Sequence, residues 1–327
     1  MDPLPVTESN QEYSMLTFTL KRLLSGVILL FAVATATFFL AHAAIPDPTL
    51  GLLGSAATPE AQASLAQKIG TDRPVVVQYG EWILQLVQGN FGDSWRNFQP
   101  VSEQIATKLP VTLSVVTIAI LLSALLGGVL GVLAGLRPNT WIDKLVKAGA
   151  VVLFALPGFW VALVLVMLFA VQLKWFPAVG YTQPGQSLSG WALSITLPAI
   201  ALAVGAVVMI AEQLRNAIIQ ADRQDYVRTL RSRGLPRHRI VIHLLRNAAP
   251  ASLTVLALMF VGLLSGAIVV EQIFALPGIG ALTQGSSQNG DIPMLLGITV
   301  ITVVFVVIVN FLLDILLGWI NPKARVK

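Results

Sequence analysis

Hydrophobic residues in this chain occur in long uninterrupted blocks separated by short polar segments. Six blocks are long enough as helix, roughly 20 residues, to cross a bilayer core about 30 Å thick. The first block exceeds the apolar core of a signal peptide, about 7 to 15 residues, so we expect a retained helix. The pattern therefore predicts an all-α polytopic membrane protein with six transmembrane helices. The six blocks are Leu23 to Ile45, Val111 to Leu136, Leu145 to Leu173, Trp191 to Ala211, Ser252 to Ala275, and Pro293 to Ile320.

The polar segments divide the chain into a transmembrane domain, residues 23–320, flanked by an N-terminal segment, 1–22, and a short tail, 321–327. Within the domain, an external loop at 46–110 contains a helical run from Tyr79 to Gln88 that we expect to pack on the outer helix ends.

A second long polar segment, the loop 212–247, is expected to be cytoplasmic. It predicts one helix from Leu214 to Arg231, because Gly234 favours a left-handed cap and the following Pro236 cannot continue a helix. A second helix is expected to start near Arg237 and run into the fifth span.

Composition and charge support the bilayer as solvent. Of 327 residues, 55% are hydrophobic and only 11% are charged, whereas globular chains are about a quarter charged. A soluble two-domain enzyme is therefore excluded. Of the 21 Lys and Arg residues, 16 lie in the segments 1–22, 137–147, 212–247 and 321–327. The positive-inside rule then predicts that both termini are cytoplasmic. This distribution accounts for the net charge of +5 without a nucleic-acid partner.

Residues for catalysis, metal binding or cofactor binding are not evident. The chain has no cysteine and no phosphate-binding loop of the G-x-x-x-x-G-K-[ST] type. His238 and His243 are five residues apart, which is the wrong spacing for a metal pair on one helix face. Ser265 has no histidine at comparable depth to act as a base, which argues against an intramembrane protease. Glu271 and Asp314 lie near span ends, so a proton-coupled carrier is the less favoured alternative.

Small residues and prolines inside the spans indicate how the helices pack. Gly127, Gly131 and Gly135 repeat every four residues and predict a face that another helix approaches closely. Pro157 and Pro198 remove backbone donors within the third and fourth spans, which predicts kinks unless neighbouring groups satisfy the freed carbonyls. We expect Asp314 to lie within reach of the basic residues of the tail, Lys323 and Arg325.

The cytoplasmic loop, EQLRNAIIQADRQDYVRTLRSRGLPRHRIVIHLLRNAAP, resembles the permease subunits of ABC importers of the dipeptide/oligopeptide type. That family carries a pattern like D-Y-V-R-T-A-R-A-K-G-L before its fifth helix, followed by a His and R-N-A. The segments HAAIPDPT, IGTDRPVVVQYGEW, GNFGDS and VVEQIFALPGIG are also similar to the family. The loop positions that match are Asp225, Tyr226, Val227, Arg228, Thr229, Arg231, Gly234, Leu235, His243, Arg246, Asn247 and Ala248.

The resemblance implies a type I importer permease fold in a bacterial plasma membrane. It implies contact with membrane lipid and four partners: a second homologous permease subunit, two cytoplasmic ATPase subunits that hold ATP and Mg, and an external solute-binding protein. The solute would be di- or oligopeptides, with nickel or glutathione as alternatives. No enzyme activity is expected in this chain.

Two groups of residues receive roles from the resemblance. The first would couple the permease to the ATPase: Asp225, Tyr226, Arg228, Thr229, Arg231, Arg233, Gly234 and Leu235. The second would form an outer gate or a docking surface for the binding protein: Glu271, Phe274, Pro277 and Gly278.

Overall fold

The computed structural model describes residues 8–54 and 57–320, which form helices joined by short connections, with one isolated bridge between Asp93 and Pro100. Residues 1–7 of the predicted N-terminal segment, 1–22, lie outside the described residues, as does the whole predicted tail, 321–327. Two π-helical turns, Ser123–Gly127 and Val166–Gln172, continue α5 and α8. The helices are α1 Glu8–Ala44, α2 Pro48–Leu53, α3 Pro59–Ile69, α4 Val75–Val87, α5 Val101–Leu122, α6 Gly128–Leu136, α7 Trp141–Ala155, α8 Gly158–Leu165, α9 Leu188–Asp222, α10 Asp225–Ser232, α11 Arg237–Ile273, α12 Ile279–Asn289 and α13 Ile292–Ile320.

Five helical segments of the described chain are long and apolar enough to cross a membrane, and the third predicted span is a broken pair. The pair bends by 104° between α7 and α8. Leu156 adopts an extended backbone there, because a residue before proline is disfavoured in the α region. The kink expected at Pro157 is thus confirmed, whereas α9 continues through Pro198.

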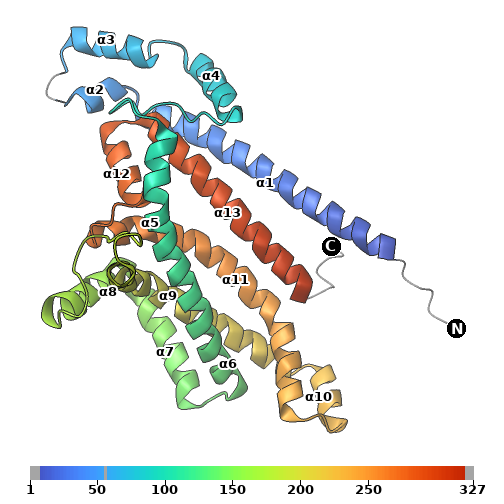
Figure 1. Ribbon diagram of the computed structural model, residues 1–327. Helices are drawn as coiled ribbons and strands as arrows, with labels where there is room; N and C mark the ends of the chain where they lie inside the picture. Colours follow the sequence, from blue (N-terminus) through green and yellow to red (C-terminus); the bar gives the residue numbers. More distant parts are fainter. Residues whose placement is uncertain (1–7, 55–56, 321–327) are drawn as a thin grey trace.

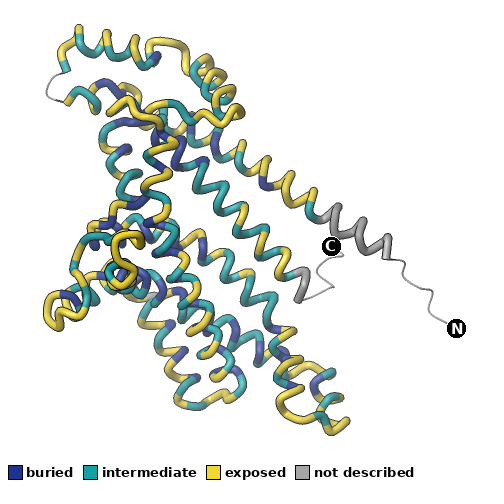
Figure 2. The backbone as a smooth tube through the Cα atoms, in the orientation of Figure 1, coloured by how far each residue is buried: buried dark blue, intermediate teal, exposed yellow. Residues whose placement is uncertain are grey.

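The helices are arranged around α9, which packs against α5, α6, α7, α8 and α11 (Figure 1). Many of its buried positions are small alanines, such as Ala199, Ala203 and Ala206, which let several helices approach one axis. Helix α1 packs mainly on α13. Figure 2 shows the buried positions concentrated where the helices meet, with exposed residues along the outer faces.

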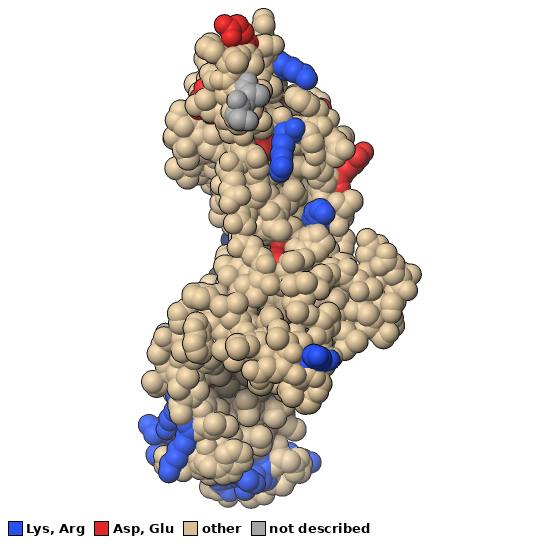
Figure 3. All heavy atoms as spheres, turned by 90° about the vertical axis from the view of Figure 1, so that its left-hand side faces the viewer, with Lys and Arg blue, Asp and Glu red and all other residues tan. Residues whose placement is uncertain are grey.

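The two ends of the molecule differ in charge. Short helices α2, α3 and α4 cover one end, and α10 lies at the other (Figure 1). Lys and Arg gather at the α10 end, and a broad belt of surface that carries only isolated charged side chains separates this cluster from the opposite end (Figure 3). We call the two ends the basic end and the α2–α4 end. A mostly uncharged belt between two polar ends is the surface expected of a chain that spans a bilayer.

The glycine face of α6 lies against α9. A Cβ added at Gly127 would sit 2.7 Å from the carbonyl oxygen of Val207, and one added at Gly131 would sit 2.8 Å from that of Ala211. Gly135 similarly faces Ile218. Backbone thus meets backbone along this seam, which only glycine permits at this separation.

We expect Gly131→Ala to lower the stability of the folded protein by about 1–3 kcal/mol, because the methyl group overpacks the α6–α9 seam. The measurement is thermal unfolding in detergent. Gly128→Ala is the matched control, since a Cβ there meets nothing within 4 Å. Equal unfolding temperatures for the two variants would contradict the close packing.

Asp314 pairs with a residue that the sequence analysis did not name. Asp314 Oδ2 lies 2.9 Å from Arg22 Nε, which joins α13 to α1. The expected partners Lys323 and Arg325 lie outside the described residues. Helices α1 and α13 pack closely at Gly26 and Val307, one turn from Arg22 and two turns from Asp314. This contact brings the two ends of the ion pair together.

Candidate functional site

The predicted coupling residues gather on α10 and the turn that follows it. The prediction of one helix from Leu214 to Arg231 is wrong, because α9 ends at Asp222 and α10 begins at Asp225. Gln224 between them has an extended backbone with ψ of 147°. This break redirects the chain so that the apolar side of α10 packs back on α9 and α11, which a continuous helix would not allow.

The apolar side of α10 anchors it to the bundle. Val227 is fully buried and packs with Ala221 of α9 and with Ile240 and Leu244 of α11. Tyr226 reinforces this contact, since Asn247 Nδ2 donates a hydrogen bond of 3.0 Å to its hydroxyl. Helix α10 therefore moves with the long helices α9 and α11 rather than as an independent loop.

The opposite side of α10 is exposed and basic. The side chains of Arg228 and Asp225 are 77% and 95% exposed, and their ion pair at 3.6 Å is loose. Arg231 Nη2 donates to Asp222 at 2.6 Å, and Arg233 and Thr229 are also exposed. Exposed pairs of this kind contribute little to stability, so these side chains remain available for contacts with another molecule.

A tight turn separates α10 from α11. Gly234 has a φ of +70°, in the left-handed region that glycine adopts without strain. The amide of Gly234 donates to the carbonyl of Arg231 at 3.0 Å, and that of Leu235 donates to Leu230 at 3.2 Å. These bonds close the end of α10 in the manner of a left-handed helix cap. The turn confirms the stop predicted at this position.

A cavity of about 920 Å³ opens beside α10, between the α6–α7 turn and the facing parts of α9 and α11. Its arginines come from three elements: Arg215 and Arg223 from the end of α9, Arg231 from α10 and Arg237 from α11. The sequence analysis did not identify this cavity, because it forms only when these elements meet.

Asp143 fixes the wall of this cavity. The carboxylate is fully buried, and it accepts hydrogen bonds from the amide of Asn139 at 2.8 Å, from Lys147 Nζ at 3.1 Å and from the guanidinium of Arg215. The bond to Arg215 links α7 to α9. In the sequence, an acidic residue among basic ones is a signal for a structural ion pair. The sequence did not indicate that the partner is Arg215, 72 positions away.

At the α2–α4 side of the bundle, Glu271 forms a buried junction between three helices. It is 1% exposed, near the end of α11. Its carboxyl group accepts hydrogen bonds from the hydroxyl of Thr112 on α5 and, at 3.1 Å, from the amide of Ala281 in the first turn of α12. Thr112 in turn accepts from the amide of Ile279 at 2.8 Å. A carboxylate at a helix N-terminus is favourable because free amides and the helix dipole both point toward it.

The other predicted outer residues lie around this junction. Gly278 is the N-cap residue of α12, and any Cβ there would collide with the carboxyl group of Glu271. Phe274 is buried like Glu271, so neither side chain is presented to an external protein in this conformation; Pro277 is exposed. Helix α12, which the sequence analysis did not predict, follows directly.

Asp291 forms a second buried polar junction at the α2–α4 end, and the sequence analysis missed it. It accepts hydrogen bonds from Ser94 Oγ at 2.5 Å and from the amide of Trp95 at 3.1 Å, which ties the segment before α5 to the start of α13. The available signal was an Asp directly before the apolar run that begins Ile292-Pro293, a typical helix start.

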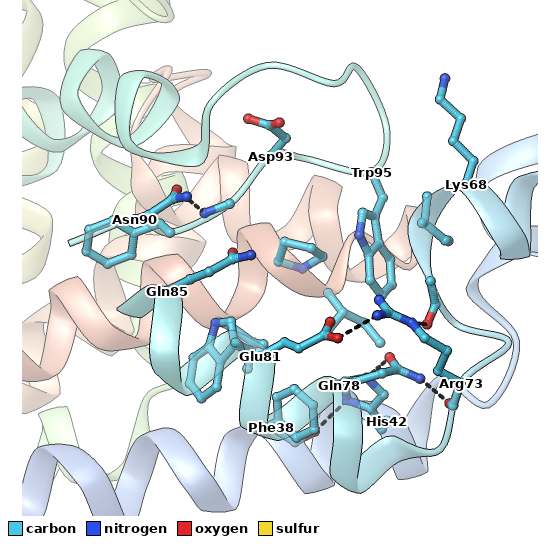
Figure 4. Close-up of a pocket in the computed structure, with 18 of the residues that line it drawn as sticks. Phe38, His42, Lys68, Arg73, Gln78, Glu81, Gln85, Asn90, Asp93 and Trp95 are labelled. Carbon is cyan, nitrogen blue, oxygen red and sulfur yellow. Dashed lines mark hydrogen bonds and ion pairs between the residues drawn. The ribbon is translucent and has the colours of Figure 1, made fainter. Parts of the chain in front are cut away.

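A cavity of about 430 Å³ at this end is bounded by α1, α4, the segment 90–98 and the start of α13 (Figure 4). Arg73 Nη1 donates to Glu81 at 2.6 Å on one side of it, and His42 lies 3.3 Å from Gln78. Phe38 and Trp82 stack beneath at 5.4 Å between ring centroids. We call this space the outer cavity.

Comparison with known proteins gives consistent matches over nearly the whole chain. The model of the family described as binding-protein-dependent transport system inner membrane component matches residues 127–326, and that of its N-terminal region matches residues 15–116. A putative peptide transport system permease protein of Brucella abortus is 36% identical over 312 residues, 95% of this chain and 99% of that protein. An oligopeptide transport system permease protein of Bacillus subtilis is 32% identical, over 95% of this chain and 100% of that protein. A glutathione transport system permease protein of Salmonella paratyphi A is 32% identical, over 96% and 100%.

Proposed function

This chain belongs to the family of binding-protein-dependent transport system inner membrane components, and we propose that it is the membrane-spanning permease subunit of an ATP-driven importer for di- or oligopeptides. Its apolar helices and its family make it a multi-pass protein of the bacterial inner membrane. The observation that carries the proposal is α10, a short helix anchored by Val227 and presenting exposed arginines at the basic end.

In this proposal α10 is the surface that meets a cytoplasmic ATPase subunit. Arg228, Arg231 and Arg233 suit acidic groups on that partner, because complementary charge orients two surfaces as they associate. A movement imposed on α10 would pass into α9 and α11 through Val227 and its neighbours, since Val227 is fully buried in this contact. Two ATPases would hold ATP and Mg, a second homologous permease would complete the pathway, and an external binding protein would deliver the solute.

The buried junction around Glu271 serves as a gate element in the same proposal. Glu271, Thr112 and the first turn of α12 hold α5, α11 and α12 in one arrangement. Alternating access requires such contacts to exchange between states, and a buried polar junction has discrete arrangements rather than a continuous range. Gly278 lets α12 begin directly against the carboxyl group, so Glu271 positions the outer helix instead of touching the binding protein.

The test is solute uptake by the full transporter, with its proposed partners, in proteoliposomes. We expect a labelled peptide to accumulate only with hydrolysable ATP, and we expect accumulation to persist when an ionophore collapses the proton gradient. Glutathione and nickel ions are tested in parallel, because relatives of this chain include a glutathione permease. Uptake that survives without ATP hydrolysis but stops with the ionophore would instead indicate a secondary transporter.

A further inference from the structure

Helix α4 has three distinct sides, and one of them is apolar but packs against nothing in the described chain. The inward side carries Tyr79 and Trp82, whose rings contact Phe38 of α1. A polar side carries Glu81 and Gln85, which turn toward the outer cavity (Figure 4).

The third side is aliphatic and exposed. Val76, Leu84 and Val87 are 72%, 64% and 69% exposed, and Val77 is 45% exposed. At 100° per residue these positions fall within one sector of about 100°, next to the polar side of the helix that carries Glu81 and Gln85. Four exposed aliphatic side chains on one flank of a 13-residue helix need a partner to cover them.

The position of α4 along the length of α1 indicates what covers this flank. The first membrane-spanning segment, Thr19–Ala44, has 26 residues and is therefore about 39 Å long, which exceeds the bilayer core of about 30 Å. Trp82 contacts α1 at Phe38, roughly 9 Å short of the end of this segment. Figure 1 shows α4 beside the outer end of α1, whereas α3 lies farther out. Helix α4 is therefore level with the edge of the bilayer core.

The surface of α1 next to α4 is also apolar and exposed, as expected of a surface that faces lipid. Phe39 and Leu40 are 42% and 69% exposed, and the ring of Phe39 lies 5.2 Å from that of Tyr79. The exposed apolar surface of α1 thus continues into α4. Tyr79 and Trp82 are also the residue types that accumulate at the boundary between membrane and water.

We propose that α4 is an interfacial helix whose aliphatic flank, Val76, Val77, Leu84 and Val87, inserts into the outer leaflet of the bilayer. Its polar flank then faces the outer cavity and the water above it. A helix of this kind lies in the plane of the membrane with its apolar side about 5–10 Å into the boundary of headgroups and acyl chains. It holds one wall of the outer cavity at the membrane surface.

A protein partner fits this flank less well. Protein interfaces are enriched in aromatic residues, Met and Arg, and the flank contains only Val and Leu. The aromatic residues of α4 are already used against α1. The proposal stands apart from the transport function, since it needs only that the chain spans a membrane with its α2–α4 end outside.

The experiment uses the absence of cysteine from this chain. Single variants Val76→Cys, Leu84→Cys and Val87→Cys probe the aliphatic flank, and Glu81→Cys and Gln85→Cys are matched controls on the polar flank. Each full-length variant is spin-labelled in nanodiscs of phosphatidylcholine and phosphatidylglycerol. Collision rates are measured with oxygen, which concentrates in the membrane, and with a water-soluble nickel chelate. We expect the ratio of oxygen to nickel collisions to shift in favour of oxygen at the three flank sites and in favour of nickel at the two controls.

Equal accessibility to the nickel chelate at Leu84→Cys, Val87→Cys and Gln85→Cys would overturn the proposal, because the flank would then lie in water. Protection that appears at the flank sites only after a solute-binding protein is added would also overturn it, in favour of a protein partner. A flank that favours oxygen with and without that protein supports the insertion.

Discussion

Replacing Gly234 by valine is expected to abolish solute uptake while ATP hydrolysis continues. A β-branched residue at a φ of +70° costs roughly 1–2 kcal/mol or more. A strain of about 2 kcal/mol shifts the equilibrium away from the native turn by roughly 30-fold. Because a Cβ at Gly234 meets nothing within 4 Å, the strain is confined to the turn, and α10 is misdirected while the bundle stays folded.

The control for this prediction is Gly234→Asn, since asparagine tolerates the left-handed region better than valine. Uptake and ATP hydrolysis are measured on the same reconstituted sample, and helix content is checked by circular dichroism. We expect the asparagine variant to retain most of the uptake. Normal uptake by the valine variant would show that the turn after α10 does not transmit the closure of the ATPase.

Replacing Glu271 by alanine is expected to lower the free energy of unfolding by about 3 kcal/mol and to reduce uptake strongly. The change leaves the hydroxyl of Thr112 and the amide of Ala281 without their acceptor in a buried site, and each unsatisfied buried donor costs about 1–3 kcal/mol. The first turn of α12 also loses its negative partner. The outer ends of α5, α11 and α12 would then separate more easily.

The matched control is Gln272→Ala at the next position of α11, which is exposed and whose side-chain amide donates a hydrogen bond to Gln284. Unfolding is followed by thermal denaturation in detergent, and uptake and docking of the binding protein are measured beside it. An alanine variant of Glu271 that unfolds, docks and transports like the control would remove both the structural and the gating role.

Much of the architecture was predictable because the bilayer constrains it strongly. Every backbone polar group must be satisfied within the membrane, so long apolar runs such as Pro293 to Ile320 have little choice but to form helices. The break at Pro157 and the turn at Gly234 were also local, since both depend on backbone restrictions of single residues. The break between α9 and α10 at Arg223 and Gln224 could not be predicted from local preferences. It accompanies the burial of Val227, on α10, against α9 and α11.

Part of the candidate site was likewise predictable from the sequence, and part was not. The residues of α10 were recognisable from their order along the chain, and their roles in coupling and gating remain predictions. The sequence showed Glu271 as an isolated acidic residue near a span end, but its hydrogen bonds to Thr112 and α12 depend on residues 159 positions away and on an unpredicted helix.

By itself the sequence determined the membrane class, the number of apolar blocks, the one-sided distribution of charge and the family. These follow from composition and from short-range backbone preferences, which act within a few residues. The tertiary structure alone decided which polar groups meet: Asp143 with Arg215, Asp291 with Ser94, and Asp314 with Arg22. It also decided that the aliphatic flank of α4 is left uncovered, because burial is a property of all neighbouring elements together and no single segment specifies it.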